Sequence, residues 1–320
     1  MSPAIIRRLQ SLRYVGYAVI VAAGALAHGS TPAFAVQTQP ALAWSFYVRT
    51  TNAQTLYNLG YNQGVSDKNN NQSSEVVLDF GVQWSDNAHT ELTGGSTLVT
   101  YAQVENMAEQ FAVGYWAGTG SDTTTVLRLA VGTNNSTGYE STTLGSGWAN
   151  VAVTIKNWLT SNGYEYYGQE NIWGANDIEP SWGGTSSQTN AENWANGYSS
   201  NGSSLYVDYG SADGCPSTGY GGCNNGWSQY GEYYVSWGAS AAYGLPEIYY
   251  SVNASQWTWI STYAKNYRGG AIWFQGPLDD HFLDGNSLTP SGAWTTFWSD
   301  MNAAGDNPGM VYSCEIHIAS

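Results

Sequence analysis

Strand-like and helix-like segments alternate along most of the chain, and this alternation limits the fold more than any other feature. Short apolar or β-branched runs, typical of buried strands, occupy residues 75–81, 123–134, 169–179, 204–211, 232–238, 245–250 and 270–278. Segments with the spacing of amphipathic helices lie among them, at residues 51–68, 100–118, 147–163, 190–202, 254–269 and 291–305.

Strands that alternate with helices of this length indicate βαβ units and a parallel sheet. Seven strands and about six helices predict an α/β fold, a single (β/α)8-like barrel of the TIM type with one irregular or missing unit. An open doubly wound sheet is the alternative. Such a sheet usually carries a Gly-rich nucleotide-binding turn after its first strand, and LDFGVQWSDN (residues 78–87) contains no G-x-G-x-x-G.

The first 35 residues have the pattern of a secretory signal peptide. Three arginines form a basic region, residues 14–27 are apolar or small, and Ala33-Phe34-Ala35 fits an A-x-A cleavage site. A membrane anchor is the alternative, but this apolar run is short for a span that needs about 20 residues. We therefore expect a secreted, extracellular protein with a signal peptide at residues 1–35 and one barrel domain at residues 36–320.

Charge and aromatic content narrow the range of partners. Without the leader, six basic residues stand against 24 acidic ones, and such a surface repels nucleic acids and anionic membranes. We expect a monomer without a cofactor that binds no nucleic acid and does not insert into a membrane after cleavage of the leader. The chain has 15 Trp and 24 Tyr but only seven Phe, and rings with a polar edge suit sugars. This balance favours a polysaccharide or peptidoglycan partner.

Three cysteines in an exported chain predict one disulfide and one free thiol. Cys215 and Cys223 lie close together in a Gly-rich and Ser-rich segment, residues 210–227, and we expect them to form a local structural bridge. Cys314 is then left over. A zinc site needs more ligands at suitable spacing than this pair has, so we expect no metal.

Acidic residues gather where the predicted strands end, although only 10% of the residues are charged. Barrel active sites lie at the C-terminal ends of the strands. Asp177 and Glu179 are two positions apart, which on a strand places both on one face, and Pro180 then ends the segment. Asp79 and Asp208 end two other strands. Glu247 lies early in its strand but its side chain could also point into the barrel.

Cleavage of a glycosidic bond commonly uses two carboxyl groups, and two close acids resist ionising together, which separates their pKa values. The pattern therefore predicts Glu179 as the general acid, with Asp177 orienting the substrate or stabilising charge and with Asp79 and Asp208 assisting. For any one of these acids the alternative is a structural role, bonded to backbone amides or to Tyr and Trp donors. The predicted substrate-binding residues are Trp173, Trp182, Trp237 and Gln275, although each tryptophan is as consistent with packing.

GANDIEPSW (residues 174–182), Asp79 and the run Trp273-Phe274-Gln275 resemble parts of secreted bacterial barrels related to glycoside hydrolase family 25 and of glycoside-hydrolase-like barrels from actinobacteria. The resemblance spans about residues 75–280. It implies that Glu179 is the catalytic glutamate, that Asp177 is its aspartate, and that Asp79 is the aspartate of the first strand. Two departures bear on a muramidase activity more than on the barrel. From Asp79 the sequence reads D-F-G, where the family favours a small polar residue two positions on, and the segment of residues 210–227 is not a feature of the family.

Other kinds of site find less support. The sequence contains neither G-x-S-x-G nor H-E-x-x-H. Residues 279–284 include Asp279, Asp280 and His281, which could hold a cation, but they fit better as a solvated loop on the rim of the cleft. We therefore predict a secreted glycoside hydrolase acting on a polysaccharide or cell-wall glycan. The rival is a catalytically silent barrel that binds glycan or coats the cell surface, and a hydrolase of another bond lacks any nucleophile motif. The sequence leaves the stereochemical outcome open.

Overall fold

The computed structural model describes residues 37–164, 170–182, 186–201, 204–306 and 309–320. The chain divides into two units, Met1–Thr38 and Gln39–Ser320, and the second unit contains every element described below. The predicted signal peptide, residues 1–35, lies outside the described residues. Among the described helices, none combines the length and the apolar character that crossing a membrane requires.

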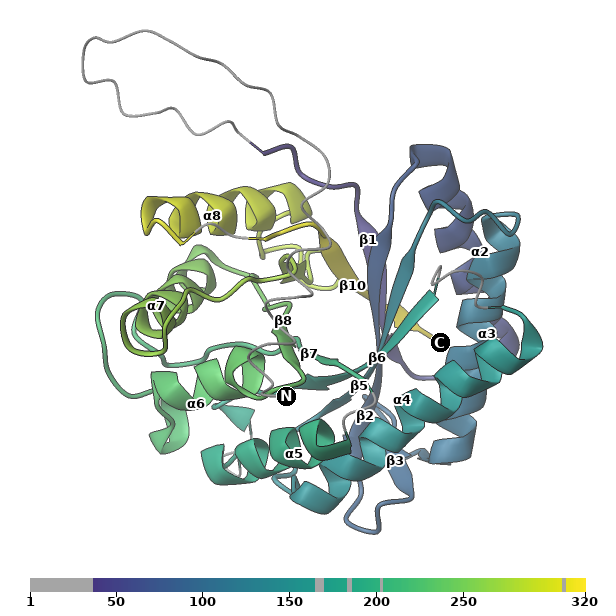
Figure 1. Cartoon of the computed structure of the whole chain (residues 1–320), viewed down its shortest axis with the longest axis horizontal. Coiled ribbons are helices and arrows are strands. Elements are labelled where there is room, and N and C mark those ends of the chain that lie inside the picture. The colour runs from purple at the N-terminus through teal and green to yellow at the C-terminus, as the bar shows by residue number, and fades with distance from the viewer. Residues whose placement is uncertain (1–36, 165–169, 183–185, 202–203, 307–308) are drawn as a thin grey trace, which may run out of the picture. The chain divides into compact units, whose positions relative to one another are not determined.

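Parallel strands close into a (β/α)8-like barrel, as the sequence predicts (Figure 1). The strands of the ring are β1 (Ala43–Val48), β2 (Ser74–Gln83), β5 (Leu127–Asn134), β6 (Glu170–Asp177), β7 (Tyr206–Asp208), β8 (Ala242–Gly244), β9 (Leu278–Asp279) and β10 (Cys314–Ala319), and they pair in the order β8-β7-β6-β5-β2-β1-β10-β9. Backbone hydrogen bonds close the ring between the segments of β8 and β9. The Gln275 N–H donates to the Gly244 carbonyl at 2.8 Å, and the Ile248 N–H donates to the Leu278 carbonyl at 2.8 Å.

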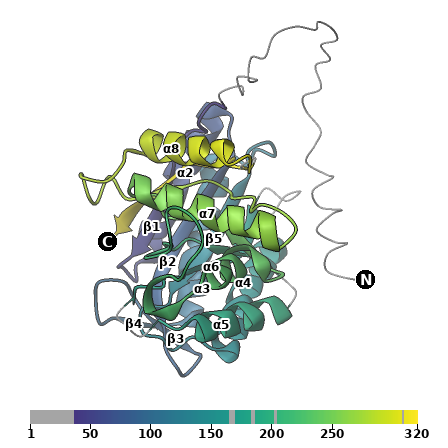
Figure 2. The same cartoon turned by 90° about the vertical axis from the view of Figure 1, so that its left-hand side faces the viewer.

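Helices follow the strands and surround the sheet, as Figures 1 and 2 show. They are α2 (Ala53–Asn70), α3 (Tyr101–Gly118), α4 (Thr142–Asn162), α5 (Gln188–Asn201), α6 (Gln229–Tyr233), α7 (Ser251–Tyr267) and α8 (Pro290–Ala303). A small hairpin of β3 (His89–Glu91) and β4 (Leu98–Thr100) separates β2 from α3. Local sequence explains several helix starts. Thr100 forms a capping box with Gln103, and Thr289 caps α8 just before a proline at its first position.

The structure corrects several of the predicted strands. Residues 245–250 contain one isolated bridge, and the strand of this region is β8, just before them; of residues 270–278, Leu278 alone lies in a strand, β9. Residues 232–238, predicted as a strand because they are rich in Tyr and Val, are helical, since Ser228 caps α6 and a π-helical turn (Tyr234–Gly238) continues it. The strands β1 and β10, which pair with each other, were not predicted. Because β1 comes first, Asp79 lies on the second strand of the ring, and the first-strand position implied by the family resemblance is wrong.

Much of the aromatic content serves the core between the sheet and the helices. Trp148, Trp194, Trp227 and Trp257 are each 1% exposed or less. Trp194 lies against Tyr198 and Tyr206, with ring centroids 5.3 and 5.2 Å away. The excess of Trp and Tyr over Phe therefore reflects packing as well as any contact with sugar.

Candidate active site

Three carboxyl groups meet at the C-terminal end of the barrel strands. They belong to Asp177, the last residue of β6, to Glu179 just after it, and to Glu247 in the segment that follows β8. One carboxylate oxygen from each lies within 4.8 Å of the others. The three residues are 0%, 7% and 4% exposed, so the group is almost closed to solvent. We call these three residues the carboxyl cluster.

Hydrogen bonds on both sides fix the backbone of Glu179. Its N–H donates to the side-chain oxygen of Asn135 at 3.2 Å, and the Asn135 amide donates back to the Glu179 carbonyl at 3.2 Å. The Ser186 hydroxyl donates to the same carbonyl at 2.7 Å. Pro180 has no N–H for a strand ladder, and β6 has already ended at Asp177. Asn135 follows β5, so the position of Glu179 depends on two neighbouring strands.

Glu247 is held by the neighbouring strands and by a tyrosine. Its N–H donates to the Gly210 carbonyl at 3.2 Å, and it forms a parallel bridge with Leu278. The Tyr249 hydroxyl donates to one of its carboxylate oxygens at 2.5 Å. The Glu247 carboxyl also hydrogen-bonds to that of Glu179. Two carboxyl groups make such a bond only when one of them carries a proton, so the pair shares a proton.

Burial governs the protonation of the carboxyl cluster. It raises the pKa of Glu179 to about 7, and the charge of Asp213 acts in the same direction. It also raises the pKa of Asp177 well above the usual range, and the charges of Glu179 and Glu247 add to this effect. The pKa of Glu247 is likewise raised, first by burial and then by the charge of Glu179. The carboxyl cluster therefore remains partly protonated at mildly acidic pH.

Asp79 lies inside the barrel beneath this cluster. It is in register with Gly132 of β5, which pairs with Ala175 of β6, two positions before Asp177 and on the same face. The Gly81 N–H donates to its carboxylate at 2.5 Å, and burial raises the pKa of Asp79 to about 6. The residue at position 81 must be glycine, because φ is +76° and a Cβ would come within 2.0 Å of the Glu91 carbonyl oxygen.

Asp208 belongs to a different set of buried acids. It is in register with Asn176 rather than Asp177, so it points to the face of the sheet opposite the one Asp177 occupies. The Asn176 amide donates to Glu140 at 2.8 Å. Burial, with a contribution from the charge of Glu140, raises the pKa of Asp208 well above its usual range. The structure thus places Asp208 near Glu179 but outside the carboxyl cluster.

Trp173 and Gln275 gather around Arg128, away from the carboxyl cluster. The Arg128 guanidinium lies 3.9 Å from the centre of the Trp173 ring and donates to the Gln275 side-chain oxygen at 2.5 Å. Trp173 comes four residues before Asp177 on β6, which separates them by about 13 Å along the strand. Trp237 contacts Tyr243, which also contacts Trp173. These three aromatic residues are half-buried, and Trp173 lies in the N-terminal half of β6, away from the carboxyl cluster at its other end.

Two predicted parts of the site remain, Trp182 and the loop of residues 279–281. Trp182 is half-buried shortly after Glu179, at the same end of the strands. Asp279 is fully buried at the end of β9, and burial raises its pKa to about 8. The His281 ring Nδ1 lies 3.0 Å from the Ser287 carbonyl oxygen, so its contact is with a residue six positions further along the same loop.

Glu247 and Tyr249 are the residues that sequence reasoning did not place in the site. They stand two positions apart in LPEIYY, as Asp177 and Glu179 do in GANDIEPSW. Tyr47 on β1 belongs with them, because burial raises the pKa of its hydroxyl and the charges of Glu247 and Asp177 raise it further. Its strand was not predicted, so no sequence signal pointed to it.

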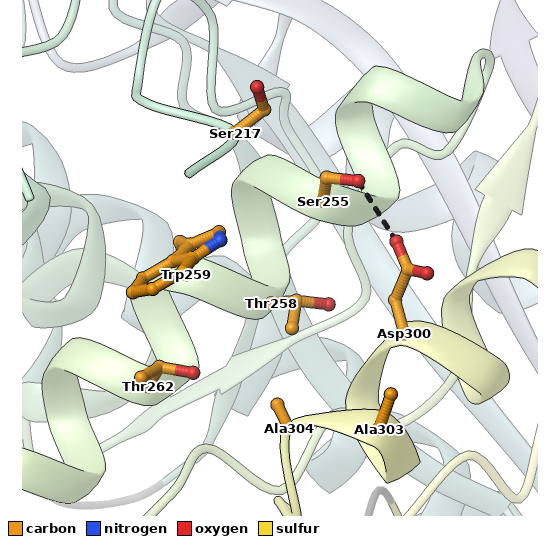
Figure 3. A pocket seen from close by; sticks show the side chains of 8 residues that line it. All are labelled: Ser217, Ser255, Thr258, Trp259, Thr262, Asp300, Ala303 and Ala304. Carbon is orange, nitrogen blue, oxygen red and sulfur yellow. Dashed lines mark hydrogen bonds between the residues drawn. The ribbon is translucent and has the colours of Figure 1, made fainter. Parts of the chain in front are cut away.

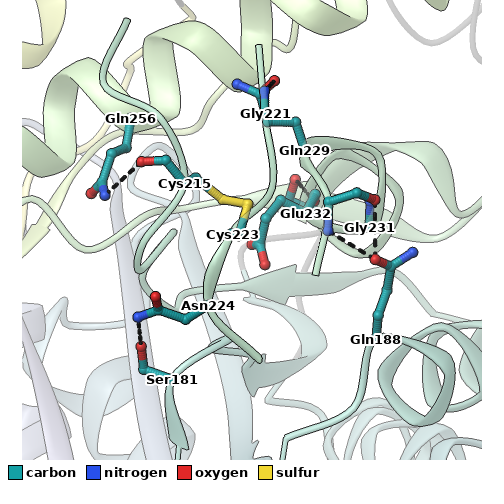
Figure 4. Close-up of a disulfide and its surroundings, with 12 residues drawn as sticks. Ser181, Gln188, Cys215, Gly221, Cys223, Asn224, Gln229, Gly231, Glu232 and Gln256 are labelled. Atoms are coloured by element: carbon teal, nitrogen blue, oxygen red, sulfur yellow. Dashed lines mark hydrogen bonds between the residues drawn. A yellow bond between two sulfur atoms is a disulfide. The ribbon is translucent and has the colours of Figure 1, made fainter. Parts of the chain in front are cut away.

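A disulfide joins Cys215 to Cys223, the pair expected from the sequence, and Cys314 is a buried free thiol (Figure 4). The loop that carries the bridge packs on the segment after Glu179. The Asn224 amide donates to the Ser181 hydroxyl at 2.5 Å, and the Asn225 amide donates to the Pro180 carbonyl at 2.6 Å. This disulfide loop, residues 211–228, therefore packs beside the carboxyl cluster, and Ser211 at its start hydrogen-bonds to Glu179.

Three carboxylates this close can hold either shared protons or a divalent cation. Among the described residues, the carboxyl cluster is the group whose ligand atoms are near enough to meet on one ion. The hydrogen bond between Glu179 and Glu247 corresponds to the protonated state.

No protein family model matches the sequence, and no functionally curated protein matches it either. Among solved structures, the chain is similar to a fungal β-1,4-galactanase at 12% identity and a TM-score of 0.36, over 77% of this chain and 68% of that one. It is also similar to the endo-1,4-β-mannanase from Rhizomucor miehei at 11% identity and a TM-score of 0.42, over 87% and 84% of the two chains. TM-scores below 0.5 are too low to transfer an activity. The barrel is therefore assigned from its strand topology, and the site from its geometry.

Proposed function

We propose that this protein is a secreted glycoside hydrolase that cleaves a glycosidic bond in a polysaccharide or cell-wall glycan. The observation that carries the proposal is the proton-sharing pair of Glu179 and Glu247, with Asp177 beside it, at the end of the barrel where catalytic groups lie. Glu179 is the general acid. Its pKa of about 7 keeps it largely protonated in mildly acidic solution, as an acid catalyst requires.

Glu247 takes the second carboxyl role. In the first step Glu179 gives its proton to the glycosidic oxygen while the Glu247 carboxylate attacks the anomeric carbon, which forms a glycosyl ester and releases the leaving sugar as an alcohol. In the second step Glu179, now ionised, takes a proton from water. The resulting hydroxide displaces Glu247 and frees the second sugar. In the free pair, burial and the charge of Glu179 raise the pKa of Glu247 further than that of Glu179, so the shared proton lies on Glu247 and must pass to Glu179 across their hydrogen bond before the first step. The hydrogen bond from the Tyr249 hydroxyl lowers the pKa of Glu247 and so favours this transfer.

The distances favour this retaining course over inversion. Inverting enzymes hold their carboxyl groups about 6.5–9.5 Å apart to admit a water, whereas retaining enzymes hold them at about 5–5.5 Å. Glu179 and Glu247 hydrogen-bond to each other, closer than in either class, so the two carboxyl groups must separate to admit a sugar, and the retaining separation needs the smaller movement.

The rival function is a barrel that binds glycan without cleaving it. The burial of the carboxyl cluster favours this rival, because a sugar reaches Glu179 only if part of the surrounding structure moves, and the disulfide loop beside it is the candidate. In the hydrolase, the Asn224 and Asn225 contacts to residues 180–181 are the ones that must open.

Hydrolysis of a panel of glycans by the mature protein tests the proposal. The family resemblance places peptidoglycan in the panel, and the two similar structures add β-1,4-galactan and β-1,4-mannan. Release of reducing ends from at least one glycan supports the hydrolase. Binding to a glycan without any cleavage over the pH range 4–8 supports the silent barrel. Amino-terminal sequencing of the protein recovered from the culture medium tests secretion, for which we expect a start near Val36.

A further inference from the structure

A cavity of about 350 Å³ lies on the outside of the barrel, and none of its lining residues belongs to the carboxyl cluster. It is formed by α7, α8 and the start of the disulfide loop, and Figure 2 shows the two helices side by side. Its lining residues are Ser217, Ser255, Thr258, Trp259, Thr262, Asp300, Ala303 and Ala304 (Figure 3). One indole and four hydroxyl groups therefore face a small space, with a single carboxylate.

Thr258 is the residue in this cavity whose hydrogen bonding is incomplete. It is 7% exposed, and its hydroxyl has no hydrogen-bond partner in the structure. Figure 3 shows that hydroxyl turned toward the Asp300 side of the cavity. A buried hydroxyl without a partner carries a free-energy cost that a bound polar group removes. Asp300 is already engaged, since it accepts a hydrogen bond from Ser255 at 3.0 Å.

An aromatic strip extends the cavity along α7. Trp259, Tyr263 and Tyr267 are spaced four residues apart, which places them on one face of the helix. Tyr220, from the disulfide loop, lies against all three, with ring centroids 5.7, 6.3 and 5.3 Å away. Tyr220 and Tyr267 are 47% and 59% exposed. An aromatic strip of this size on an outer surface is unusual for a helix that only packs against a sheet.

We propose that this cavity and the adjoining strip bind a neutral glycan, separately from the carboxyl cluster. Flat rings with polar edges stack on the apolar faces of sugars, and the free hydroxyl of Thr258 and the hydroxyls of its neighbours match sugar hydroxyls. An anionic ligand is excluded by the net charge of −15 and by the carboxylate in the cavity. The site holds a polymer on the outer surface of the barrel, and it does not depend on whether the protein cleaves that polymer.

Affinity electrophoresis of the mature protein tests this site. The probes are soluble β-1,4-mannan, soluble β-1,4-galactan and hydroxyethylcellulose, each cast into a native gel. We expect at least one of them to retard the wild type. Trp259→Ala removes the stacking ring, and Thr258→Val removes only the hydroxyl while it keeps the shape of the side chain. Each variant should weaken retardation about tenfold, the effect of losing one good contact.

Two control variants distinguish binding in this cavity from binding elsewhere on the protein. Trp44→Ala removes a tryptophan that is 47% exposed and lies outside the cavity, and it should be retarded like the wild type. Glu179→Gln should also be retarded like the wild type, even if it abolishes hydrolysis. The proposal is overturned if no probe retards the wild type, or if Thr258→Val and Trp259→Ala are retarded as strongly as Trp44→Ala. Loss of retardation in Glu179→Gln alone would place binding at the carboxyl cluster and also overturn it.

Discussion

The carboxyl groups of Glu179 and Glu247 hydrogen-bond to each other although their strands, β6 and β8, are separated in the sheet by β7. The bond passes over the end of β7, which stops at Asp208. Two acids in this arrangement titrate as a pair, with a singly protonated state over an intermediate pH range. That state provides the acid and the carboxylate nucleophile of the proposed reaction at the same time.

Replacing the proposed general acid should remove activity and leave the fold intact. Glu179→Gln keeps the shape of the side chain but cannot donate the catalytic proton, so turnover should fall by a factor of about 10²–10⁴. Glu109→Gln is the matched control, because Glu109 is also 7% exposed with a pKa raised to about 7, yet it lies on α3. Steady-state rates on any glycan that the wild type cleaves measure both. Equal rates for Glu179→Gln and the control would assign Glu179 a structural role.

The reaction should proceed with retention of anomeric configuration. Oxygens of Glu179 and Glu247 lie within 4.8 Å of each other, nearer to the separation in retaining than in inverting enzymes. Proton NMR during the first minutes of hydrolysis identifies which anomer is released before mutarotation mixes the two. An inverted product would remove Glu247 from the nucleophile role and indicate that the pair opens to admit a water.

Asn135 should act as a positioning residue for Glu179. Asn135→Ala removes both hydrogen bonds between this side chain and the backbone of Glu179. We expect kcat to fall about 10–100-fold, since small misplacements of a catalytic group are costly, while KM changes little. Asn135→Asp keeps the acceptor for the Glu179 N–H and should recover part of kcat. A variant that melts at a lower temperature but keeps the wild-type kcat would limit Asn135 to a structural role.

The sequence predicted the barrel and the Asp177–Glu179 pair because both depend on short-range patterns. Alternating segments indicate parallel strands, and a two-residue spacing places side chains on one face. It did not place Glu247 in the site, because the approach of Glu247 to Glu179 depends on how the closed ring brings β8 near β6. The strands β1 and β10 escaped prediction for a similar reason. Each is six residues long, and their pairing joins opposite ends of the chain.

Asp208 shows a further limit of the sequence pattern. It ends a strand as Asp177 does, so the pattern places the two together. Register decides otherwise, because Asp208 pairs with Asn176 and a shift of one residue turns a side chain to the other face. Register is set when strands pair in the assembled sheet, so the sequence of a single strand does not predict it.

Stability should fall as pH rises from about 4.5 to 8. A carboxyl whose pKa is higher in the folded state stabilises the fold fully below its unfolded pKa and loses this contribution as pH rises through its folded pKa. Burial raises the pKa of Glu140 from 4.5 to about 8 and that of Asp79 from 3.8 to about 6, so both act in this window. Thermal melting at pH 5 and pH 8 measures the fall. Glu140→Gln should reduce it, whereas Glu192→Gln, on α5, should not. An identical pH dependence in Glu140→Gln and wild type would contradict this assignment.

The disulfide loop should control access to the carboxyl cluster as well as stability. The bridge between Cys215 and Cys223 closes a loop with a sequence separation of 8 residues, which by chain entropy stabilises the fold by about 2–3 kcal/mol. Replacing both cysteines by serine should lower the melting temperature. It should also lower KM, because the contacts of Asn224 and Asn225 with residues 180–181 would open more readily. Asn225→Gly is the matched variant, since it removes the contact with the Pro180 carbonyl, still adopts the left-handed backbone of this position (φ 51°) and leaves the bridge in place. If KM stays at the wild-type value in both variants while the melting temperature falls, the loop stabilises the barrel without gating the site.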